Sequence, residues 1–406
     1  MRVVRIYHAG RDSSHRARER ALVAAGAEVT LIVPAHWPEN DSLHDEPFEV
    51  IELPVHRAGD VNRHRFVDPA AVLATVTAAR PDVVDLHEEP VSAVTRQLLP
   101  LFGPTQAVVG YTAQNIDKRW PPPFAGWERA ALRRLAAVYP CSRQAASVVR
   151  GKGFAGSIAV VPLGVDPAIF SAVGRRPGGA ELRLTFVGRL VEEKGVLDAV
   201  RVLAALRQPA RLRIAGDGPL AEAALALAAG LGVGRATTLL GQLYPTDLAD
   251  LYRDTDVLLV PSRATPRWVE QYGRVVTEAR ACGAAAAGYA TGSLPEVIGA
   301  HELLVPDGDV AALAAVVTAA PAQAGPAQAG PVPTWDEVAA AQLELYERAL
   351  RPEASRPAGR AVAVAEFGPT AAVPGGRRPF ALPLLRGDTA ASRTLAAAFD
   401  RLGRGD

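Results

Sequence analysis

Short runs of apolar and β-branched residues alternate with segments rich in Ala, Leu and Arg along most of this chain. Such alternation is typical of parallel sheets, because a crossover helix must join each pair of parallel strands. The first predicted strands are residues 3–7, 29–33, 83–86, 107–111 and 158–161. Predicted helices between them include residues 14–25, 91–101 and 127–137.

The alternation starts afresh after a stretch rich in Gly and Pro at residues 162–180. Predicted strands then lie at residues 182–187, 211–214, 237–239 and 257–260, each followed by a helix. A chain of 406 residues also exceeds the usual size of a single hydrophobic core. We therefore expect an α/β protein with two doubly wound domains facing a central cleft. The expected boundaries are 1–165, 166–333, a helix at 334–350, and a largely disordered Pro/Gly/Ala-rich tail at 351–406.

Composition excludes several classes of function. A net charge of +1 gives no general reason to expect binding to nucleic acid. Two cysteines are too few for a disulfide framework, and neither has metal-ligand spacing around it. The start of the chain reads as a strand and not as a signal peptide. No apolar run approaches the ~20 residues that cross a bilayer. We expect a cytoplasmic protein that is soluble or contacts the inner face of a membrane peripherally.

The segment 261–283 carries the strongest functional signal. It reads P-S-R-A-T-P-R-W-V-E-Q-Y-G-R-V-V-T-E-A-R-A-C-G and follows a predicted buried strand. It places Glu270 and Glu278 on either side of a predicted helix start at Tyr272-Gly273. Ligands of open α/β sheets bind outside the carboxyl ends of the strands, and a helix start favours anions such as diphosphate. Carboxylates that accept hydrogen bonds from hydroxyls at each end of a diphosphate would suit a nucleotide sugar.

Two other interpretations of these glutamates exist. They could be solvated carboxylates around a helix end, or the acid/base pair of a glycosidase, whose carboxyl groups lie ~5–9 Å apart. We favour hydroxyl binding because both glutamates flank a helix start.

Two further strand ends in the second half suit a diphosphate ligand. Gly188-Arg189 follows one strand, and Lys194-Gly195 opens the next helix. Arg and Lys beside a helix start bind phosphate well, although surface charge on a turn would look the same. Gly216-Asp217-Gly218-Pro219 follows the next strand. It indicates either a tight turn with Pro at the first helical position, or a loop that lets a nucleotide base approach the backbone.

Three polar clusters follow predicted strands of the first half, at residues 10–15, 85–90 and 112–118. Because the carboxyl ends of parallel strands share one edge, these clusters can converge on one crevice. Ser13 or Ser14 is expected to cap the next helix. The candidates for binding an acceptor or positioning the sugar are Gly10, His15, His87, Glu88, Gln114, Asn115 and Lys118. None of the clusters has zinc-like spacing, so we expect no metal site.

The chain resembles the GT-B glycosyltransferases of family 4. The matching pieces occur in family order and cover most of residues 183–310. They are F-V-G-R-L-V-E-E-K-G, A-G-D-G-P-L, P-S-R with E-Q-Y-G-R-V-V-T-E-A-R-A-C-G, and T-G-S-L-P-E-V-I-G. Matches in the first half are looser: V-V-P-L-G-V-D-P-A-I-F, P-D-V-V-D-L-H-E-E-P and G-R-D-S-S-H.

The resemblance implies two Rossmann-like domains and transfer of a sugar from a nucleotide-diphosphate sugar to a hydroxyl acceptor, with retention of anomeric configuration. It implies no cofactor and no essential metal. Arg189, Lys194 and Glu270 would be catalytic, the cations holding the diphosphate and Glu270 the sugar hydroxyls. Glu278 would bind the ribose. The other implied donor-binding residues are Gly188, Gly216, Asp217, Gly218, Gln271, Tyr272, Gly273 and Arg274.

The chain departs from the family pattern in the loop after the strand at 107–111. Many relatives have a histidine there, whereas this chain has T-A-Q-N, so Gln114 or Asn115 would position the sugar. The final helix of relatives commonly crosses back to the first domain, but here it follows a linker with P-A-Q-A-G in tandem.

The sequence does not determine the acceptor, which could be a glycan precursor, a lipid-linked molecule or a small molecule. Arginines on first-half helices could contact an anionic membrane, or form solvated faces. They are Arg16, Arg18, Arg20, Arg129, Arg133 and Arg134. Alternative functions are a nucleotide-sugar epimerase or phosphorylase on the same architecture, and a non-catalytic sensor of nucleotide sugars.

Overall fold

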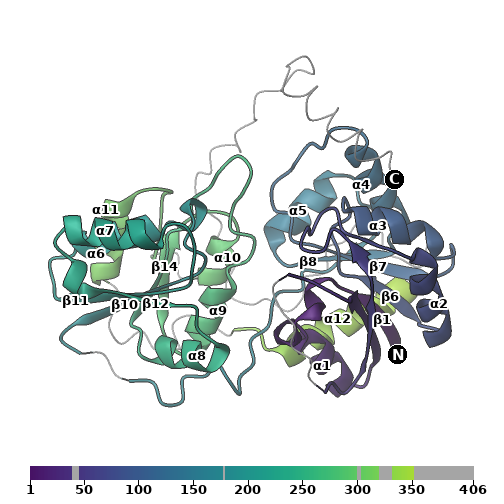
Figure 1. Ribbon diagram of the computed structural model, residues 1–406, viewed down its shortest axis with the longest axis horizontal. Helices are drawn as coiled ribbons and strands as arrows, with labels where there is room; N and C mark the ends of the chain where they lie inside the picture. Colours follow the sequence, from purple (N-terminus) through teal and green to yellow (C-terminus); the bar gives the residue numbers. More distant parts are fainter. Residues whose placement is uncertain (39–44, 177–178, 300–302, 320–331, 352–406) are drawn as a thin grey trace. The chain divides into compact units, whose positions relative to one another are not determined.

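The computed structural model describes residues 1–38, 45–176, 179–299, 303–319 and 332–351. Within these residues, two large parallel sheets form the framework, as predicted (Figure 1). The first sheet has seven described strands in the order β3-β2-β1-β6-β7-β8-β9. Their bounds are β1 (Arg2–Ile6), β2 (Glu28–Pro34), β3 (Glu49–Leu53), β6 (Val83–Leu86), β7 (Ala107–Thr112), β8 (Ala137–Pro140) and β9 (Ser157–Ile158). A small antiparallel pair, β4 (Val55–His56) and β5 (Arg65–Phe66), lies outside it.

Helices cover both faces of the first sheet. One face packs against α2 (Pro69–Ala79), α3 (Ala93–Leu98), α4 (Phe124–Arg134) and α5 (Arg143–Gly151). The other face packs against α1 (Ala17–Ala24) and α12 (Trp335–Leu350). Because both faces are buried, the central strands are mostly apolar, as in V-V-R-I and V-V-D-L. The charged residues of these two runs, Arg5 and Asp85, are buried and paired with each other.

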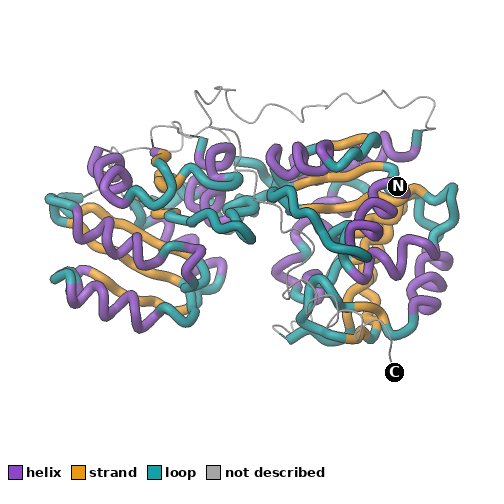
Figure 2. The backbone as a smooth tube through the Cα atoms, turned by 90° about the horizontal axis from the view of Figure 1, so that it is seen from above, coloured by secondary structure: helices purple, strands orange, loops and turns teal. Residues whose placement is uncertain are grey.

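The second sheet has six described strands in the order β12-β11-β10-β13-β14-β15. Their bounds are β10 (Leu182–Val187), β11 (Ala210–Ala215), β12 (Thr237–Gly241), β13 (Val257–Val260), β14 (Ala285–Tyr289) and β15 (Leu304–Val305). Helices α6 (Val196–Ala205), α7 (Ala221–Gly230) and α11 (Val310–Ala319) cover one face. Helices α8 (Pro245–Arg253), α9 (Arg274–Ala281) and α10 (Leu294–Ile298) cover the other, and Figure 2 shows these layers from a second direction.

The strand order changes direction once in each sheet. After β1 the chain adds β2 and β3 on one side and then β6 on the other; β10, β11, β12 and β13 repeat this pattern. The carboxyl ends of β1 and β6, and of β10 and β13, are therefore topological switch points, where open α/β sheets bind ligands.

The last described helix belongs to the packing of the first sheet. Thr334 pairs with Val165 and caps α12 through a reciprocal capping box with Glu337. Buried residues of α12, among them Tyr346, then pack beside α1, β7 and β8. None of the described helices is long and apolar enough to cross a membrane.

The structure corrects several local predictions. The helix predicted at 127–137 ends at Arg134, and Ala137 already begins β8, which was not predicted. The strand predicted at 158–161 is the shorter β9. Asp12, and neither Ser13 nor Ser14, accepts the capping hydrogen bond in this loop, and α1 has no side-chain cap. Helix α7 begins at Ala221, so Pro219 is not its first residue. The predicted tail after residue 351 and most of the P-A-Q-A-G linker lie outside the described residues.

Candidate active site

Glu270 occupies the switch point of the second sheet, in the connection from β13 to α9. Its buried carboxylate forms a salt bridge with Lys194 at 2.6 Å and accepts a hydrogen bond from the Ser262 hydroxyl at 3.0 Å. Lys194 lies just before α6, so the pair joins the two elements that follow β10 and β13. The Lys194 ammonium also lies 5.0 Å from the Trp268 ring centre, a cation–π distance. These contacts fix one carboxylate edge and one cation beside each other.

The backbone of Glu270 is held as firmly as its side chain. Its carbonyl accepts hydrogen bonds from the Ser293 amide at 3.0 Å and from the Asn115 side-chain amide at 2.7 Å. Gly292 makes this approach possible, because a Cβ atom there would lie 2.2 Å from the Glu270 carbonyl oxygen. The Ser293 hydroxyl donates to the Gln271 carbonyl at 2.6 Å. The T-G-S-L-P segment therefore positions Glu270.

The start of α9 offers free donors next to Glu270. Gly273 precedes the helix with φ +87°, in the left-handed region that glycine adopts without strain. Within the described part of the chain, the backbone amides of Tyr272, Gly273 and Arg274 have no hydrogen-bond acceptor. Such amides, with the dipole of the helix, favour an anion. The site thus places unpaired N–H groups, a lysine and a held carboxylate around one helix end.

The loops after β10 and β11 complete this side of the site. Gly216, with φ +132°, lies so close to Gly188 that a Cβ would come within 1.9 Å of the Gly188 carbonyl oxygen. Asp217 is exposed, and its carboxylate accepts a hydrogen bond from the Gly218 amide at 2.7 Å. Arg189 is exposed, and its guanidinium has no partner among the residues described. The two loops form one open backbone surface with a cation available at its edge.

Glu278 lies one turn inside α9 and is buried. Its carboxylate forms a salt bridge with Arg274 at 3.1 Å and accepts a hydrogen bond from the Tyr252 hydroxyl at 3.4 Å. Burial raises the pKa of Glu278, and the charge of Arg274 and the Tyr252 hydrogen bond oppose this rise. The structure thus holds a second buried carboxylate behind the helix start.

The first-half candidates have unequal surroundings. His87 is buried and stacked on Tyr111 at 3.9 Å, with Nδ1 2.7 Å from the Tyr139 hydroxyl. Burial and then the charge of Arg5 lower its pKa well below the usual value. His15 is exposed at the end of a short 3-10 helix. Gly10 is buried, and its carbonyl accepts a hydrogen bond from the Arg16 guanidinium at 2.6 Å. His87 is therefore a packed, neutral imidazole.

The loop after β7 is the one that contacts the Glu270 segment. Glu89 holds this loop by accepting hydrogen bonds from the Thr112 hydroxyl at 2.6 Å and the Ala113 amide at 2.8 Å. The Gln114 side chain donates to Ile116 within the loop, whereas Asn115 donates to Glu270. Lys118 lies 5.8 Å from the Trp120 ring centre. Of the two residues that could replace the family histidine, Asn115 contacts the segment that carries Glu270.

Comparison with known proteins agrees with this geometry. The family described as glycosyl transferases group 1 matches residues 176–323, and the glycosyl transferase 4-like domain matches residues 17–164. A glycogen synthase of Mycobacterium tuberculosis (strain CDC 1551 / Oshkosh) is 30% identical over 338 residues, or 73% of this chain and 78% of the relative. The chain belongs to glycosyltransferase family 4.

Solved structures show the same GT-B fold. Sucrose-phosphate synthase from Thermosynechococcus elongatus has a TM-score of 0.66 at 20% identity, covering 86% of this chain and 98% of that one. Anabaena HepE, solved in complex with UDP and glucose, has a TM-score of 0.60 at 16% identity, covering 85% and 98%. The predicted fold class is confirmed.

Several residues of this glycosyltransferase were not predicted to belong to a site. Ser262 and Ser293 hold Glu270 and Gln271, and their positions after β13 and β14 could have suggested them. In the first half, His8 follows β1, and its amide and its Nδ1 both lie 2.8 Å from Glu88. Burial alone would lower the pKa of His8. The charge and the hydrogen bond of Glu88 outweigh this effect, so the pKa is raised above its usual value. His64, beside them, comes from a loop with no sequence signal.

Two groups of arginines differ in their availability. Arg16 and Arg18 are buried, and Arg18 donates to Gln342 of α12 and to the Pro162 carbonyl. They cannot form a membrane-facing surface, contrary to one interpretation of the sequence. Arg129 and Arg133 are exposed on α4.

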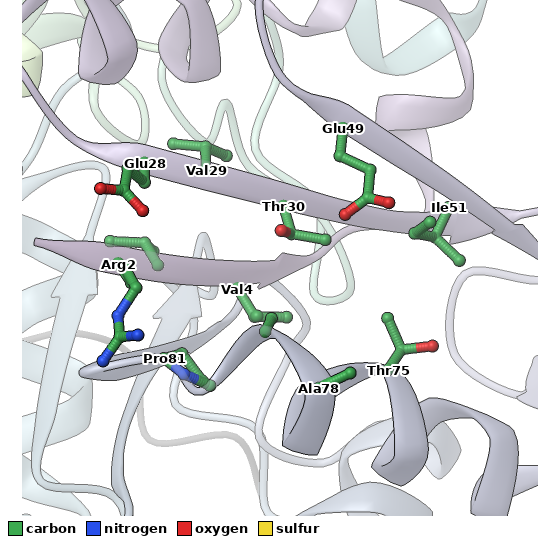
Figure 3. Close-up of a pocket in the computed structure, with 12 residues that line it drawn as sticks. Arg2, Val4, Glu28, Val29, Thr30, Glu49, Ile51, Thr75, Ala78 and Pro81 are labelled. Atoms are coloured by element: carbon green, nitrogen blue, oxygen red, sulfur yellow. The ribbon is translucent and has the colours of Figure 1, made fainter.

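A hollow of about 380 Å³ lies away from the site (Figure 3). It is bounded by α2 and by the amino-terminal halves of β1, β2 and β3, with Arg2, Glu28 and Glu49 at its edge. None of the predicted site residues lines it. Because ligands of such sheets bind at the carboxyl ends, we do not assign the activity to this hollow.

Proposed function

We propose that this glycosyltransferase transfers a hexose from a nucleoside-diphosphate sugar to a hydroxyl of its acceptor, with retention of anomeric configuration. The observation that carries the proposal is the Glu270–Lys194 salt bridge of 2.6 Å, placed directly before the unpaired amides of α9. A carboxylate suits sugar hydroxyls, whereas a lysine and a helix start suit a diphosphate. The two ligand preferences meet at one helix end, as they do in a nucleotide sugar.

The residues can support departure of the diphosphate. As the bond between the anomeric carbon and the phosphate oxygen breaks, negative charge develops on the leaving phosphate. Arg189, Lys194 and the amides of Tyr272, Gly273 and Arg274 are the groups that would stabilise this charge. Preorganised donors of this kind do not need a metal ion for that step, so we propose that the diphosphate is held without one. Gly188 and Gly216 leave the backbone open for the nucleotide.

The proton of the acceptor hydroxyl would go to the departing phosphate. The acceptor oxygen then bonds to the anomeric carbon on the face that the phosphate leaves, so the configuration is kept and no enzyme nucleophile is needed. Glu270 would accept hydrogen bonds from the sugar hydroxyls during this step. Glu278, which is deeper in α9, would accept hydrogen bonds from the ribose. Burial raises the pKa of Glu278, and Arg274 and Tyr252 offset only part of this rise. Such a carboxylate would gain from the hydroxyl partners that a bound nucleotide supplies.

The donor and acceptor classes follow from chemistry and from the relatives. Anabaena HepE was solved with UDP and glucose, and the mycobacterial relative is named as a glycogen synthase. We propose a nucleotide sugar as donor here, and a glycan precursor, lipid-linked molecule or small molecule as acceptor. The exposed arginines of α4 support peripheral contact with an anionic membrane when the acceptor is lipid-linked.

Transfer of labelled sugar by Glu270→Ala and Lys194→Ala tests the proposal. Each variant should lower kcat by at least ~100-fold, the typical effect of removing one group that stabilises developing charge. The control is Glu192→Gln, an exposed carboxylate one turn from Lys194, which should keep its activity. Circular dichroism should show that all three variants are folded. Full activity in both alanine variants would overturn the assignment.

Two further measurements test the reaction type. NMR of the anomeric configuration of the product decides between retention and inversion. Formation of epimerised donor without any acceptor would favour an epimerase.

A further inference from the structure

Three side chains of the first half gather at the switch point of its sheet. His8 and Glu88 each lie two residues after the end of a strand, β1 and β6, so both lie at the carboxyl ends of neighbouring strands. His64 joins them from the turn immediately before β5. Proposed sugar transfer from the donor site uses neither histidine. The location is therefore a ligand-binding position of the fold whose chemistry is unassigned.

The three ligand atoms are close enough to share one ion. One ring nitrogen each of His8 and His64 and one carboxylate oxygen of Glu88 all lie within 4.8 Å of one another. Nδ1 of His8 is 2.8 Å from Glu88 Oε1, and Nε2 of His64 is 3.8 Å from the same oxygen. With metal–ligand distances of 2.0–2.2 Å, ligand atoms around a tetrahedral ion are about 3.3 Å apart. Shifts of roughly half an ångström would bring both separations to this value.

The surroundings orient the ligands as metal sites do. Nδ1 of His64 lies 3.2 Å from the Asp60 carbonyl, which can only accept, so this nitrogen carries the proton and Nε2 presents its lone pair. Metal-binding histidines commonly donate their other ring N–H to a carbonyl or carboxylate in this way. The Trp37 ring lies 5.0 Å from His8 and 5.2 Å from His64 and shields them on one side. His64 and Glu88 are almost fully buried, while His8 keeps 17% of its side chain exposed.

We propose that His8, His64 and Glu88 bind a divalent transition-metal ion of the Zn²⁺ class. Two imidazoles and one carboxylate form the ligand set of open zinc sites, in which a fourth position takes water or a ligand oxygen. Calcium and magnesium prefer oxygen ligands alone, so two nitrogens argue against them. The exposed edge of His8 is where the fourth ligand would enter, and an acceptor's hydroxyl or phosphate oxygen has the required chemistry.

The proposal departs from the expectation that the chain holds no metal site, which rests on the spacing within three polar clusters of the first half. Two of the three ligands, His8 and His64, lie outside those clusters. The metal site lies at the first sheet, whereas the proposed diphosphate site lies at the second, and it is tested by metal binding itself. A failed binding test therefore leaves the proposed transfer reaction untouched, and a failed transfer test leaves the metal site untouched.

Binding of Co²⁺ and Zn²⁺ to the chelator-treated full chain tests the site. Calorimetry with Zn²⁺ should give one ion per chain, and Co²⁺ should give the intense visible absorption of a four- or five-coordinate ion. His8→Gln, His64→Gln and Glu88→Gln should each weaken binding at least ~10-fold, since even loss of an outer-shell partner has that effect. The control His56→Gln changes an exposed histidine on β4 and should bind like the unsubstituted chain.

Melting of the metal-free variants shows whether each one folds. If a variant does not fold, X-ray absorption at the zinc edge of the zinc-loaded, unsubstituted chain is measured in place of that variant's binding test. Two imidazole nitrogens in the zinc shell support the site, and a shell of oxygen alone overturns it. The proposal is also wrong if the unsubstituted chain binds no ion, or if all three variants bind as tightly as the control.

Discussion

Asn115 is the side chain that joins the loop after β7 to the segment that carries Glu270. Its amide donates to the Glu270 carbonyl at 2.7 Å. Removing it leaves that carbonyl bonded to Ser293 alone, so Glu270 is less firmly placed. We expect Asn115→Ala to lower kcat/KM about 10- to 100-fold, because small misplacements of a catalytic group cost rates of this order. Steady-state kinetics against the donor measures the effect.

Gln114→Ala is the matched control for Asn115→Ala. The Gln114 amide donates to Ile116 inside its own loop, whereas the Asn115 amide donates to Glu270. Its loss should change kcat/KM much less than loss of Asn115. Equal losses in the two variants would show that the loop acts through its general conformation, and that the Asn115–Glu270 hydrogen bond has no special role.

Glu278 predicts how stability depends on pH. Burial raises its pKa in the folded chain above the unfolded value of 4.5, so the folded state binds the proton more tightly. The stabilisation is then fully present below pH 4.5 and is lost as pH rises through the folded pKa. Glutamine at this position does not ionise, so the Glu278→Gln variant does not lose this stabilisation as pH rises. The free energy of unfolding of the variant, measured relative to the unsubstituted chain, should therefore increase between pH 4.5 and 7. A difference that is constant over this range contradicts the prediction.

The sequence predicts the arrangement around the second sheet's switch point better than the arrangement of the first-half loops. Lys194 and Glu270 could be predicted because each follows a predicted strand, and the strand order brings the two strands together. Whether Gln114 or Asn115 contacts the donor segment depends on the path of a loop, which local sequence does not determine. His64 could not be predicted either, because its place beside His8 and Glu88 depends on packing between segments distant in sequence.

At the scale of elements, α12 is attached to the first sheet by a buried polar network. The Tyr346 hydroxyl donates to Asp85 of β6, which also accepts hydrogen bonds from Tyr139 at 2.6 Å and from Arg5. We expect Tyr346→Phe to destabilise the chain by about 1–3 kcal/mol, because it leaves a buried carboxylate with one donor fewer. Denaturant unfolding measures the change.

Tyr244→Phe is the control for this element. Tyr244 is 78% exposed, so removing its hydroxyl should leave the free energy of unfolding nearly unchanged. A Tyr346→Phe variant as stable as Tyr244→Phe would mean that apolar packing alone holds α12 in place.

Two strands that the sequence did not predict, β8 and β3, were missed for different reasons. Strand β8 is four residues long and only two residues separate it from α4, so its A-V-Y-P resembles the end of the helix. Strand β3 lies at the sheet edge, and none of its residues is fully buried, so its E-V-I-E-L has no long apolar run. Central strands such as β1, β6, β10 and β13 were predicted because burial on both faces favours runs of mostly apolar residues.

At the scale of the whole molecule, a nucleotide that binds only the folded chain must raise its stability. Binding at a concentration 100 times the dissociation constant contributes ~2.7 kcal/mol. Melting scans with UDP, GDP and ADP at equal concentration should therefore show a rise in Tm that is largest for the base of the true donor. No rise with any of the three would contradict a nucleotide-sugar site.

The same scans on Lys194→Ala separate specific from general stabilisation. The proposed site holds the diphosphate through Lys194, Arg189 and the α9 amides, so loss of Lys194 should reduce the rise in Tm for the preferred nucleotide. The base itself would lie against the backbone around Gly216, which the substitution does not touch. The order of preference among the three nucleotides should thus survive while every shift becomes smaller. A variant whose shifts equal those of the unsubstituted chain would place the nucleotide elsewhere on the molecule.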